Sequence, residues 1–119
     1  MAAIKLTPKT YEAWKAFLGN KTVRKVENNT EIRQTANIGK PNVFALYLHG
    51  NRIAVWTEDG LIKLSDGGYR SNTTKARLNQ FVPVSIYQKD YVWYIGDQTF
   101  QEGTTVRVNE ITGKASISD

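Results

Sequence analysis

The sequence predicts an α+β fold made mostly of antiparallel strands, arranged as a meander and a second hairpin sheet. Three observations predict this class. Residues 43–65 alternate apolar and polar side chains between pairs of turn-forming residues, which is typical of a meander. Residues 84–101 repeat that alternation and indicate the second sheet. Apolar residues recur at helical spacing in residues 8–18 and again at about 73–81. A sandwich-like and a half-barrel arrangement of the sheets both fit this pattern.

Length and composition favour one domain spanning residues 1–119. No stretch reaches the roughly 20 apolar residues of a membrane span, and the first residues lack the apolar run of a signal peptide. With no cysteine there is no disulfide or thiolate chemistry, and the single His49 excludes a metal site built from several imidazoles. We therefore expect an intracellular protein without metal or cofactor.

The positive charge is concentrated at one end of the chain. Residues 1–42 carry eight Lys or Arg and three Glu, whereas residues 43–119 carry eight side chains of each sign. If the first third forms one surface, that surface would attract polyanions or acidic protein patches. The alternative is a basic face that only aids solubility.

The first elements are a helix and a polar strand pair. A helix is expected from about Pro8 to Leu18, with Thr7 as N-cap and Gly19 as its stop. Its apolar stripe is expected to pack on the sheet. A hairpin over residues 22–36 follows, turning at Asn28-Asn29, and then a loop over residues 39–42 where Pro41 blocks a strand.

The meander allows a register to be predicted. If Gly50-Asn51 and Asp59-Gly60 form two-residue turns, Trp56 pairs with Ala45 on one side and with Lys63 on the other. On that register one face is wholly apolar and belongs to the core; it carries Phe44, Leu46, Leu48, Ile53, Val55, Ile62 and Leu64. The opposite face displays Tyr47, His49, Arg52, Trp56 and Lys63.

The polar face of the meander has two interpretations. Aromatic rings interleaved with cations on an antiparallel sheet can stack unpaired bases and track phosphates, with Tyr47 and Trp56 as the stacking rings. Alternatively, these two rings pack under a helix or another strand, and Lys63 lies over Trp56 as a cation–π pair.

The stretch after the meander holds the densest chemistry of the chain. Asp66-Gly67-Gly68 turns the chain, and a helix is expected to begin after Asn72 or Thr73 and to end near Phe81. Its N-terminus could bind an anion through Ser71, Asn72, Thr73 and Thr74, helped by Arg70 and Lys75. The alternative is that these residues only cap the helix, while Arg70 and Arg77 pair with surface carboxylates. The stretch does not match the phosphate loop of nucleotide hydrolases.

The second sheet is expected to turn at Lys89-Asp90. Two-residue turns place Val84, Ile86, Trp93, Ile95 and Phe100 on one face, which we assign to the core. Tyr87 and Tyr94 are then the more exposed rings. Residues 104–108 and 114–117 form a last hairpin through Thr112-Gly113.

Residues 46–103 resemble a known group of proteins. The motifs are a Leu-His-Gly-Asn-x-Ile-Ala hairpin, then Gly-Gly-Tyr-Arg-Ser-Asn-Thr-Thr-Lys-Ala-Arg-Leu-Asn, and then Val-Ser-Ile-Tyr-Gln-Lys-x-Tyr-x-Trp-Tyr. Together they are similar to a group of small proteins encoded by tailed bacteriophages, and residues 73–79 are the most specific part. The resemblance implies an accessory phage protein in the bacterial cytoplasm, and it supplies no activity or catalytic residues.

Two functions follow as hypotheses. The first is a non-catalytic nucleic-acid-binding module; the predicted phosphate contacts are Lys21, Arg24, Lys25, Arg52, Lys63, Arg70, Lys75 and Arg77. The second is a phage protein that binds and inhibits a bacterial host protein through exposed aromatic and arginine residues. An enzyme is the weakest class, because His49 lies at a hairpin turn with no nucleophile placed beside it by the local sequence.

Overall fold

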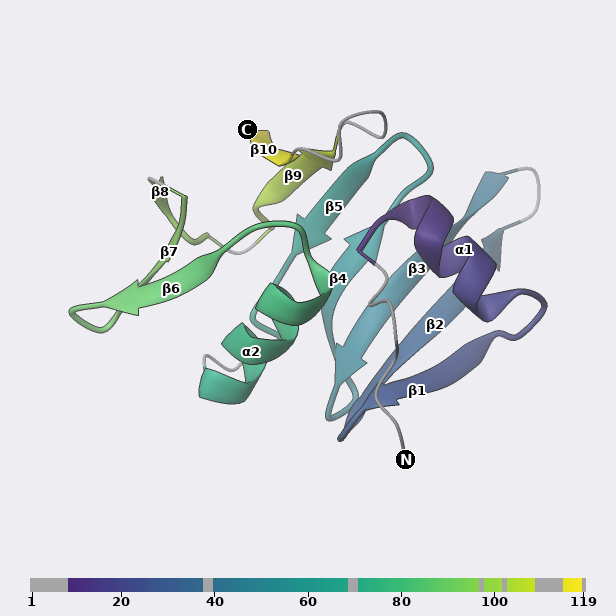
Figure 1. The fold of residues 1–119 in the computed structure, drawn as a ribbon, viewed down its shortest axis with the longest axis horizontal. Coiled ribbons are helices and arrows are strands. Elements are labelled where there is room, and N and C mark those ends of the chain that lie inside the picture. The colour runs from purple at the N-terminus through teal and green to yellow at the C-terminus, as the bar shows by residue number, and fades with distance from the viewer. Residues whose placement is uncertain are drawn as a thin grey trace.

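A computed structural model describes residues 9–37, 40–68, 71–96, 98–101, 103–108 and 115–118. These residues form helices α1 (Tyr11–Leu18) and α2 (Asn72–Phe81) and two antiparallel sheets (Figure 1). The large sheet is formed, in spatial order, by β1 (Val23–Glu27), β2 (Thr30–Asn37), β3 (Lys40–Leu48), β4 (Asn51–Trp56), β5 (Leu61–Leu64), β9 (Thr105–Val108) and β10 (Ala115–Ser118). The small sheet is formed by β6 (Ile86–Lys89), β7 (Val92–Ile95) and β8 (Gln98–Thr99). The predicted α+β class is confirmed, and the large sheet stays open and does not close into a barrel.

The core lies on one side of the large sheet. Helices α1 and α2 and the small sheet all lie against this side, which we call the inner face (Figure 1). The Trp14 ring packs against Trp56 at 5.4 Å and Phe81 at 5.6 Å between centroids. The prediction that the α1 stripe packs on the sheet is therefore confirmed. No element that the structure describes covers the opposite side, which we call the outer face.

Both helices begin at hydroxyl caps. Thr10 accepts a hydrogen bond from the Ala13 N–H at 3.2 Å, so α1 begins at Tyr11 and not at Pro8. The predicted cap Thr7 lies outside the described residues, and the predicted stop at Gly19 is confirmed, with a positive φ of 57°. Ser71 caps α2 by accepting from the Thr74 N–H at 3.1 Å, one residue earlier than expected.

The register of β3 and β4 differs from the prediction. The turn falls at His49-Gly50, both with positive φ, so Leu48 pairs with Asn51. Ile53 is then an extra residue in β4, because Leu46 pairs with Ala54 while Tyr47 pairs with Arg52. Beyond this bulge the pairing has moved by one residue from the predicted one, and Trp56 pairs with Phe44.

The next turn moves the register in the same sense. The Thr57 N–H donates to the Leu61 carbonyl at 3.0 Å, so the loop has three residues and Trp56 pairs with Ile62 instead of Lys63. Trp56 therefore lies on the inner face and Val55 on the outer face, opposite to the prediction for both. The other predicted core residues of the meander are buried as expected; they are Phe44, Leu46, Leu48, Ile53, Ile62 and Leu64.

The N-terminal strand pair turns at Asn28-Asn29 as predicted. The predicted loop over residues 39–42 is wrong, because β3 already begins at Lys40. The ladder between β2 and β3 is irregular here, with an extra residue on β3, and Pro41 lies in this interruption, where a backbone N–H is not required.

The predicted register of the small sheet is wrong, but the predicted faces of its side chains are correct. Its turn is Asp90-Tyr91 and not Lys89-Asp90, so Ile86 pairs with Ile95. This moves the pairing by two residues, which leaves every side chain on its predicted face. Ile86, Trp93, Ile95 and Phe100 are buried, as predicted, whereas Val84 precedes β6 and is only partly buried. Strands β9 and β10 form the expected last hairpin, and its turn Thr112-Gly113 lies outside the described residues.

Asn79 fastens the small sheet to α2. The Ile86 N–H donates to Asn79 Oδ1 at 2.6 Å, and Asn79 Nδ2 donates to the Ile86 carbonyl at 2.8 Å. Asn79→Ala is expected to lower the free energy of unfolding by about 1–3 kcal/mol, because both Ile86 groups lose their partner. Asn79→Asp keeps only the acceptor, so its free energy of unfolding should lie between those of the wild type and Asn79→Ala. Urea unfolding measures both, and an unchanged midpoint for Asn79→Ala would contradict this role.

Candidate nucleic-acid interface

The sheet register assigns the side chains of the outer face. Arg33, Ala45, Val55 and Lys63 form one row across β2 to β5, because each is the pairing partner of the next. Lys25, Glu31, Tyr47 and Arg52 form a second row across β1 to β4. Arg107 joins this face from β9, between the buried Val106 and Val108.

The acidic residue of the second row is already engaged. Arg33 Nε donates to the Glu31 carboxylate, and this hydrogen bond raises the pKa of the Arg33 guanidinium. The same guanidinium lies 4.0 Å from the centroid of the half-buried Tyr47 ring. Tyr47 is therefore covered on that side by Arg33. Within the described part of the chain, no ion pair joins a carboxylate to the other cations of this face, which are Lys25, Arg52, Lys63 and Arg107.

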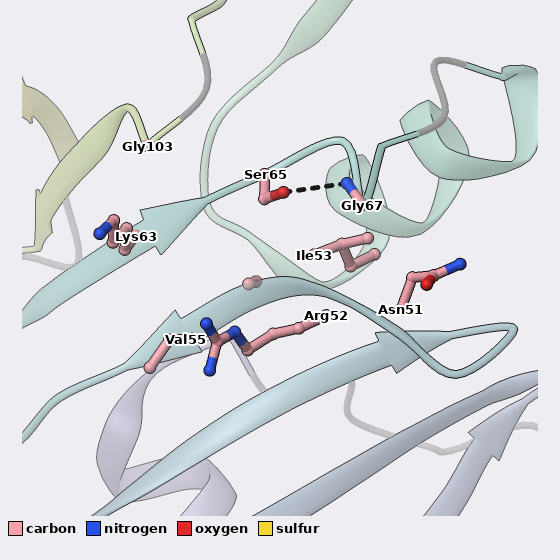
Figure 2. A pocket seen from close by; sticks show the side chains of 9 residues that line it. Asn51, Arg52, Ile53, Val55, Lys63, Ser65, Gly67 and Gly103 are labelled. Carbon is pink, nitrogen blue, oxygen red and sulfur yellow. Dashed lines mark hydrogen bonds between the residues drawn. The ribbon is translucent and has the colours of Figure 1, made fainter.

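The bulge in β4 leaves a hollow on the outer face. Ile53 and Ala54 are consecutive and both buried, so β4 has no exposed side chain between Arg52 and Val55. The segment after β5 contributes only the small residues Ser65 and Gly67 to this region. A hollow of about 520 Å³ results (Figure 2). Its lining consists of Asn51, Arg52, Ile53, Ala54, Val55, Lys63, Ser65, Gly67 and Gly103.

Gly67 closes one side of this hollow and is required there. Its φ of +68° is strained for any residue with a Cβ, and an added Cβ would lie 3.1 Å from Asn51 Cβ and 3.2 Å from Ile53 Cγ2. The Gly67 N–H donates to Ser65 Oγ at 2.9 Å within the turn (Figure 2), and the Ser65 N–H donates to the Ile53 carbonyl of β4 at 2.9 Å. The segment therefore packs tightly where its backbone crosses the bulge.

The charge in the hollow is positive. Figure 2 shows the Arg52 side chain running along β4 toward Val55, which is the pairing partner of Lys63. Both cations are exposed, and the lining contains no carboxylate. An anion entering the hollow would therefore meet two cations and no like charge from the lining.

The structure separates the predicted cations instead of gathering them. Arg24 lies on the inner side, where it donates to the Phe17 carbonyl at 3.0 Å and covers the Phe17 ring at 4.1 Å. Arg77 Nε donates to Thr30 Oγ1 at 2.9 Å and so ties α2 to the turn between β1 and β2. Lys75 Nζ donates to Gln88 Oε1 at 2.9 Å. These three side chains connect elements of the fold.

Two further predicted contacts lie away from the hollow. Lys21 is exposed in the turn between α1 and β1, and its carbonyl accepts from Gln34 Nε2 at 3.1 Å. Arg70 lies outside the described residues. Of the cations predicted as phosphate contacts, Lys25, Arg52 and Lys63 therefore share the outer face, and Arg52 and Lys63 share the hollow.

Trp56 is not a surface ring. It is 1% exposed, its Nε1 donates to the Lys9 carbonyl at 2.9 Å, and it packs against Trp14. The prediction that it stacks bases on the outer face is wrong, because the bulge and the three-residue loop turn it inward. The alternative pair with Lys63 is also wrong, since Lys63 lies on the opposite face of the sheet.

The N-terminus of α2 acts as a cap in this structure. Ser71 Oγ and Thr74 Oγ1 lie 3.0 Å apart, and Thr74 is buried, while Asn72 and Thr73 are exposed. A second hollow of about 470 Å³ lies beside this end, and Asp66 is part of its lining. An anion there would meet the Asp66 carboxylate, which disfavours the predicted anion site.

The tip of the β6–β7 hairpin exposes an aromatic residue that the sequence analysis did not single out. Tyr91 is 94% exposed and adopts a φ of +67° in the turn. Tyr87 and Tyr94, the predicted exposed rings, stack at 5.5 Å with an interplanar angle of 14°. Tyr87 is exposed as expected, and Tyr94 is half-buried. The Tyr87 hydroxyl donates to the Gly96 carbonyl at 2.8 Å.

Sequence reasoning missed the hollow and Arg107. A β-bulge leaves no mark in an alternating strand, so nothing in residues 51–56 signalled that Ile53 and Ala54 are both buried. Gly67 was a signal for a turn, but its close approach to Ile53 is visible only in three dimensions. Arg107 could have been found from the alternation of Val106, Arg107 and Val108, which places the cation opposite the core face.

Among the described residues, no group of three or more His, Asp or Glu side chains is placed to hold a metal ion. Neither α1 nor α2 is long and apolar enough to cross a bilayer, and the described residues contain no other helix.

The comparisons with known proteins place the chain in a family. A family model described as Kyanoviridae Gp96 protein matches residues 8–114, which is nearly the whole chain. No curated protein and no solved structure matches the chain.

Proposed function

This chain belongs to the Kyanoviridae Gp96 protein family and is thus a small phage protein, and we propose that its outer face binds nucleic acid without catalysing a reaction. The observation that carries the proposal is the charge of that face. Lys25, Arg52, Lys63 and Arg107 lie on one uncovered sheet surface, where the acidic Glu31 is already engaged by Arg33. Such a surface attracts the phosphate backbone.

The contacts are to phosphates and not to unstacked bases. Trp56 is buried, and the half-buried ring of Tyr47 is already stacked on one side by Arg33, so neither predicted ring is a fully open stacking platform. Neighbouring strands lie about 4.8 Å apart. Lys25 on β1 and Arg52 on β4 are separated by three such spacings, so their backbones lie about 14 Å apart. This spacing of the two cations is close to the width of the major groove of B-DNA, which is about 12 Å. A duplex is therefore the ligand we propose.

Titration with a labelled duplex of about 20 base pairs tests this function. Binding should weaken steeply with salt, and Arg107→Gln should reduce the log–log salt slope by about one, because one phosphate contact is lost. The matched control is Lys15→Gln, which removes an exposed cation on α1 and should leave the slope unchanged. A single strand of the same length should bind more weakly. Failure to bind duplex DNA or RNA at low salt would contradict the proposal.

A second function is favoured by the hairpin tip. Tyr91 is exposed in a backbone conformation that is unfavourable for tyrosine, so neither its burial nor its geometry stabilises the fold. Tyrosine is enriched among residues that dominate protein interfaces. A phage protein with such a tip can bind a bacterial host protein and inhibit it, as the sequence analysis also considered.

The variant Tyr91→Gly is expected to change the stability of the fold and the binding of a host protein in opposite directions. The variant creates an Asp-Gly turn, which suits a two-residue hairpin, so the free energy of unfolding should rise by about 0.5–1 kcal/mol. Tyr91→Ala keeps the unfavourable φ and should bring no such gain. If the tip binds a host protein, one stoichiometric partner should be captured by the wild type after nuclease treatment and lost with Tyr91→Gly. Equal capture by both would exclude the tip as the binding element.

A further inference from the structure

We infer that the hollow beside the β4 bulge binds a phosphomonoester, the chemical group found at the end of a phosphorylated nucleic-acid strand and in free nucleotides. The inference rests on the proposed function, because it assigns one part of the outer face to one kind of phosphate. It concerns the hollow between Arg52 and Lys63 and not the whole basic face.

The first argument is the charge. A phosphodiester inside a strand carries one negative charge, whereas a monoester carries about 1.5 to 2 at pH 7, since its second pKa is near 6. Two cations, Arg52 and Lys63, line the hollow, and its lining contains no carboxylate. Lys25 and Arg107 lie singly on other strands of the same face. Two cations around one hollow therefore match the dianion, and the single cations match internal phosphates.

The second argument is the shape. A flat sheet face offers no enclosure, but the bulge and the small residues Ser65, Gly67 and Gly103 create a hollow of about 520 Å³. Sites for small molecules usually measure about 300–1,000 Å³. The hollow therefore has room for the phosphate and the nucleoside attached to it. Asn51 lies at the edge of the hollow, at the end of β4 away from Val55 (Figure 2).

Two other hollows among the described residues do not fit this ligand. The one beside α2 contains the Asp66 carboxylate. A third, of about 420 Å³, lies between the small sheet and β10 and is lined by no charged side chain. Arg52 and Lys63 thus give the β4 hollow a positive charge that neither of the other two has.

The experiment compares two duplexes of identical sequence that differ only in the 5′ end. Binding of a 5′-phosphorylated and a 5′-hydroxyl duplex is measured at pH 7 and at pH 5, and a nucleoside monophosphate and its nucleoside are titrated separately. We expect about tenfold tighter binding of the phosphorylated duplex at pH 7, and a smaller ratio at pH 5, where the monoester loses charge.

The variants localise the preference. Arg52→Gln and Lys63→Gln should each bring the ratio close to one, whereas Arg107→Gln should weaken both duplexes equally and preserve the ratio. All three residues are exposed, and an unchanged thermal midpoint confirms that each variant folds. Binding of the monophosphate but not the nucleoside, lost in the Arg52 and Lys63 variants, identifies a free nucleotide as a ligand as well.

The outcomes distinguish this inference from the proposed function. Equal affinity for the two duplexes, with no binding of the monophosphate, would overturn the inference while nucleic-acid binding stands. Binding of the monophosphate without binding of either duplex would overturn the proposed function and leave the hollow as a nucleotide site. A preference that survives in both Arg52→Gln and Lys63→Gln would show that the phosphate binds elsewhere, which also overturns the inference.

Discussion

Replacing Trp56 with alanine is expected to lower the free energy of unfolding by about 3–5 kcal/mol. The indole is 1% exposed, packs against Trp14 at 5.4 Å, and donates through Nε1 to the Lys9 carbonyl. The substitution removes the largest side chain of β4 from the contact between the large sheet and α1. Because small domains are stable by only about 5–15 kcal/mol, this loss is a large fraction of the total stability.

A comparison of two phenylalanine variants tests the reason for this effect. Trp56→Phe keeps a ring but leaves the Lys9 carbonyl without the indole donor. Trp14 is equally buried, yet its Nε1 has no hydrogen-bond partner among the described residues. Trp14→Phe therefore removes an unsatisfied donor and breaks no hydrogen bond. We expect Trp56→Phe to cost about 1–2 kcal/mol more than Trp14→Phe.

Urea unfolding followed by circular dichroism measures all three variants. A loss below about 1 kcal/mol for Trp56→Ala would mean that the indole is not in the core, and would restore the possibility that it faces the ligand. Equal losses for the two phenylalanine variants would mean that the hydrogen bond to Lys9 adds nothing measurable.

The sequence could predict which residues are apolar and buried better than it could predict their pairing. In the small sheet the true turn at Asp90-Tyr91 moves the pairing by two residues, and all side chains keep their faces. In the meander the bulge at Ile53 moves it by one, and Trp56 and Val55 exchange faces. The sequence alone does not show whether a turn moves the pairing by one residue or by two, so the faces follow only from the observed strand pairing.

The site was predictable in its residue types and not in its location. Arg52 and Lys63 were identified because they stand at polar positions of the meander, and both lie on the outer face. Arg24 and Arg77 have the same charge, but their long side chains reach neighbouring elements and hold α1 and α2 to the sheet. Net charge along the chain does not reveal such contacts, because they depend on which helix lies beside which strand.

The excess charge of the first third of the chain is split by the fold. Lys25 and Arg33 point to the outer face, whereas Lys15 lies on α1 on the opposite side. Arg33 is paired with Glu31, so the outer face draws most of its available charge from the later strands β4, β5 and β9. The basic character of the interface therefore comes from residues brought together by the sheet.

Reversing the two cations of the hollow should nearly abolish nucleic-acid binding. In Arg52→Glu with Lys63→Glu, two attractions of about 1 kcal/mol each are lost and two repulsions of similar size appear. The sum of about 4 kcal/mol corresponds to a 100- to 1,000-fold weaker affinity at low salt. The loss should shrink at higher salt, because ions screen exposed charges. Anisotropy titrations with the duplex at two salt concentrations measure it.

The matched control changes the same net charge elsewhere. Lys15→Glu with Lys89→Glu also alters the charge by four units, but Lys15 lies on α1 and Lys89 at the end of β6, both exposed and away from the outer face. If the hollow holds the phosphate, the control weakens binding only slightly, through the long-range field, while the Arg52 and Lys63 pair removes it. If both pairs weaken binding to the same degree, net charge alone governs association, and the outer face has no special role.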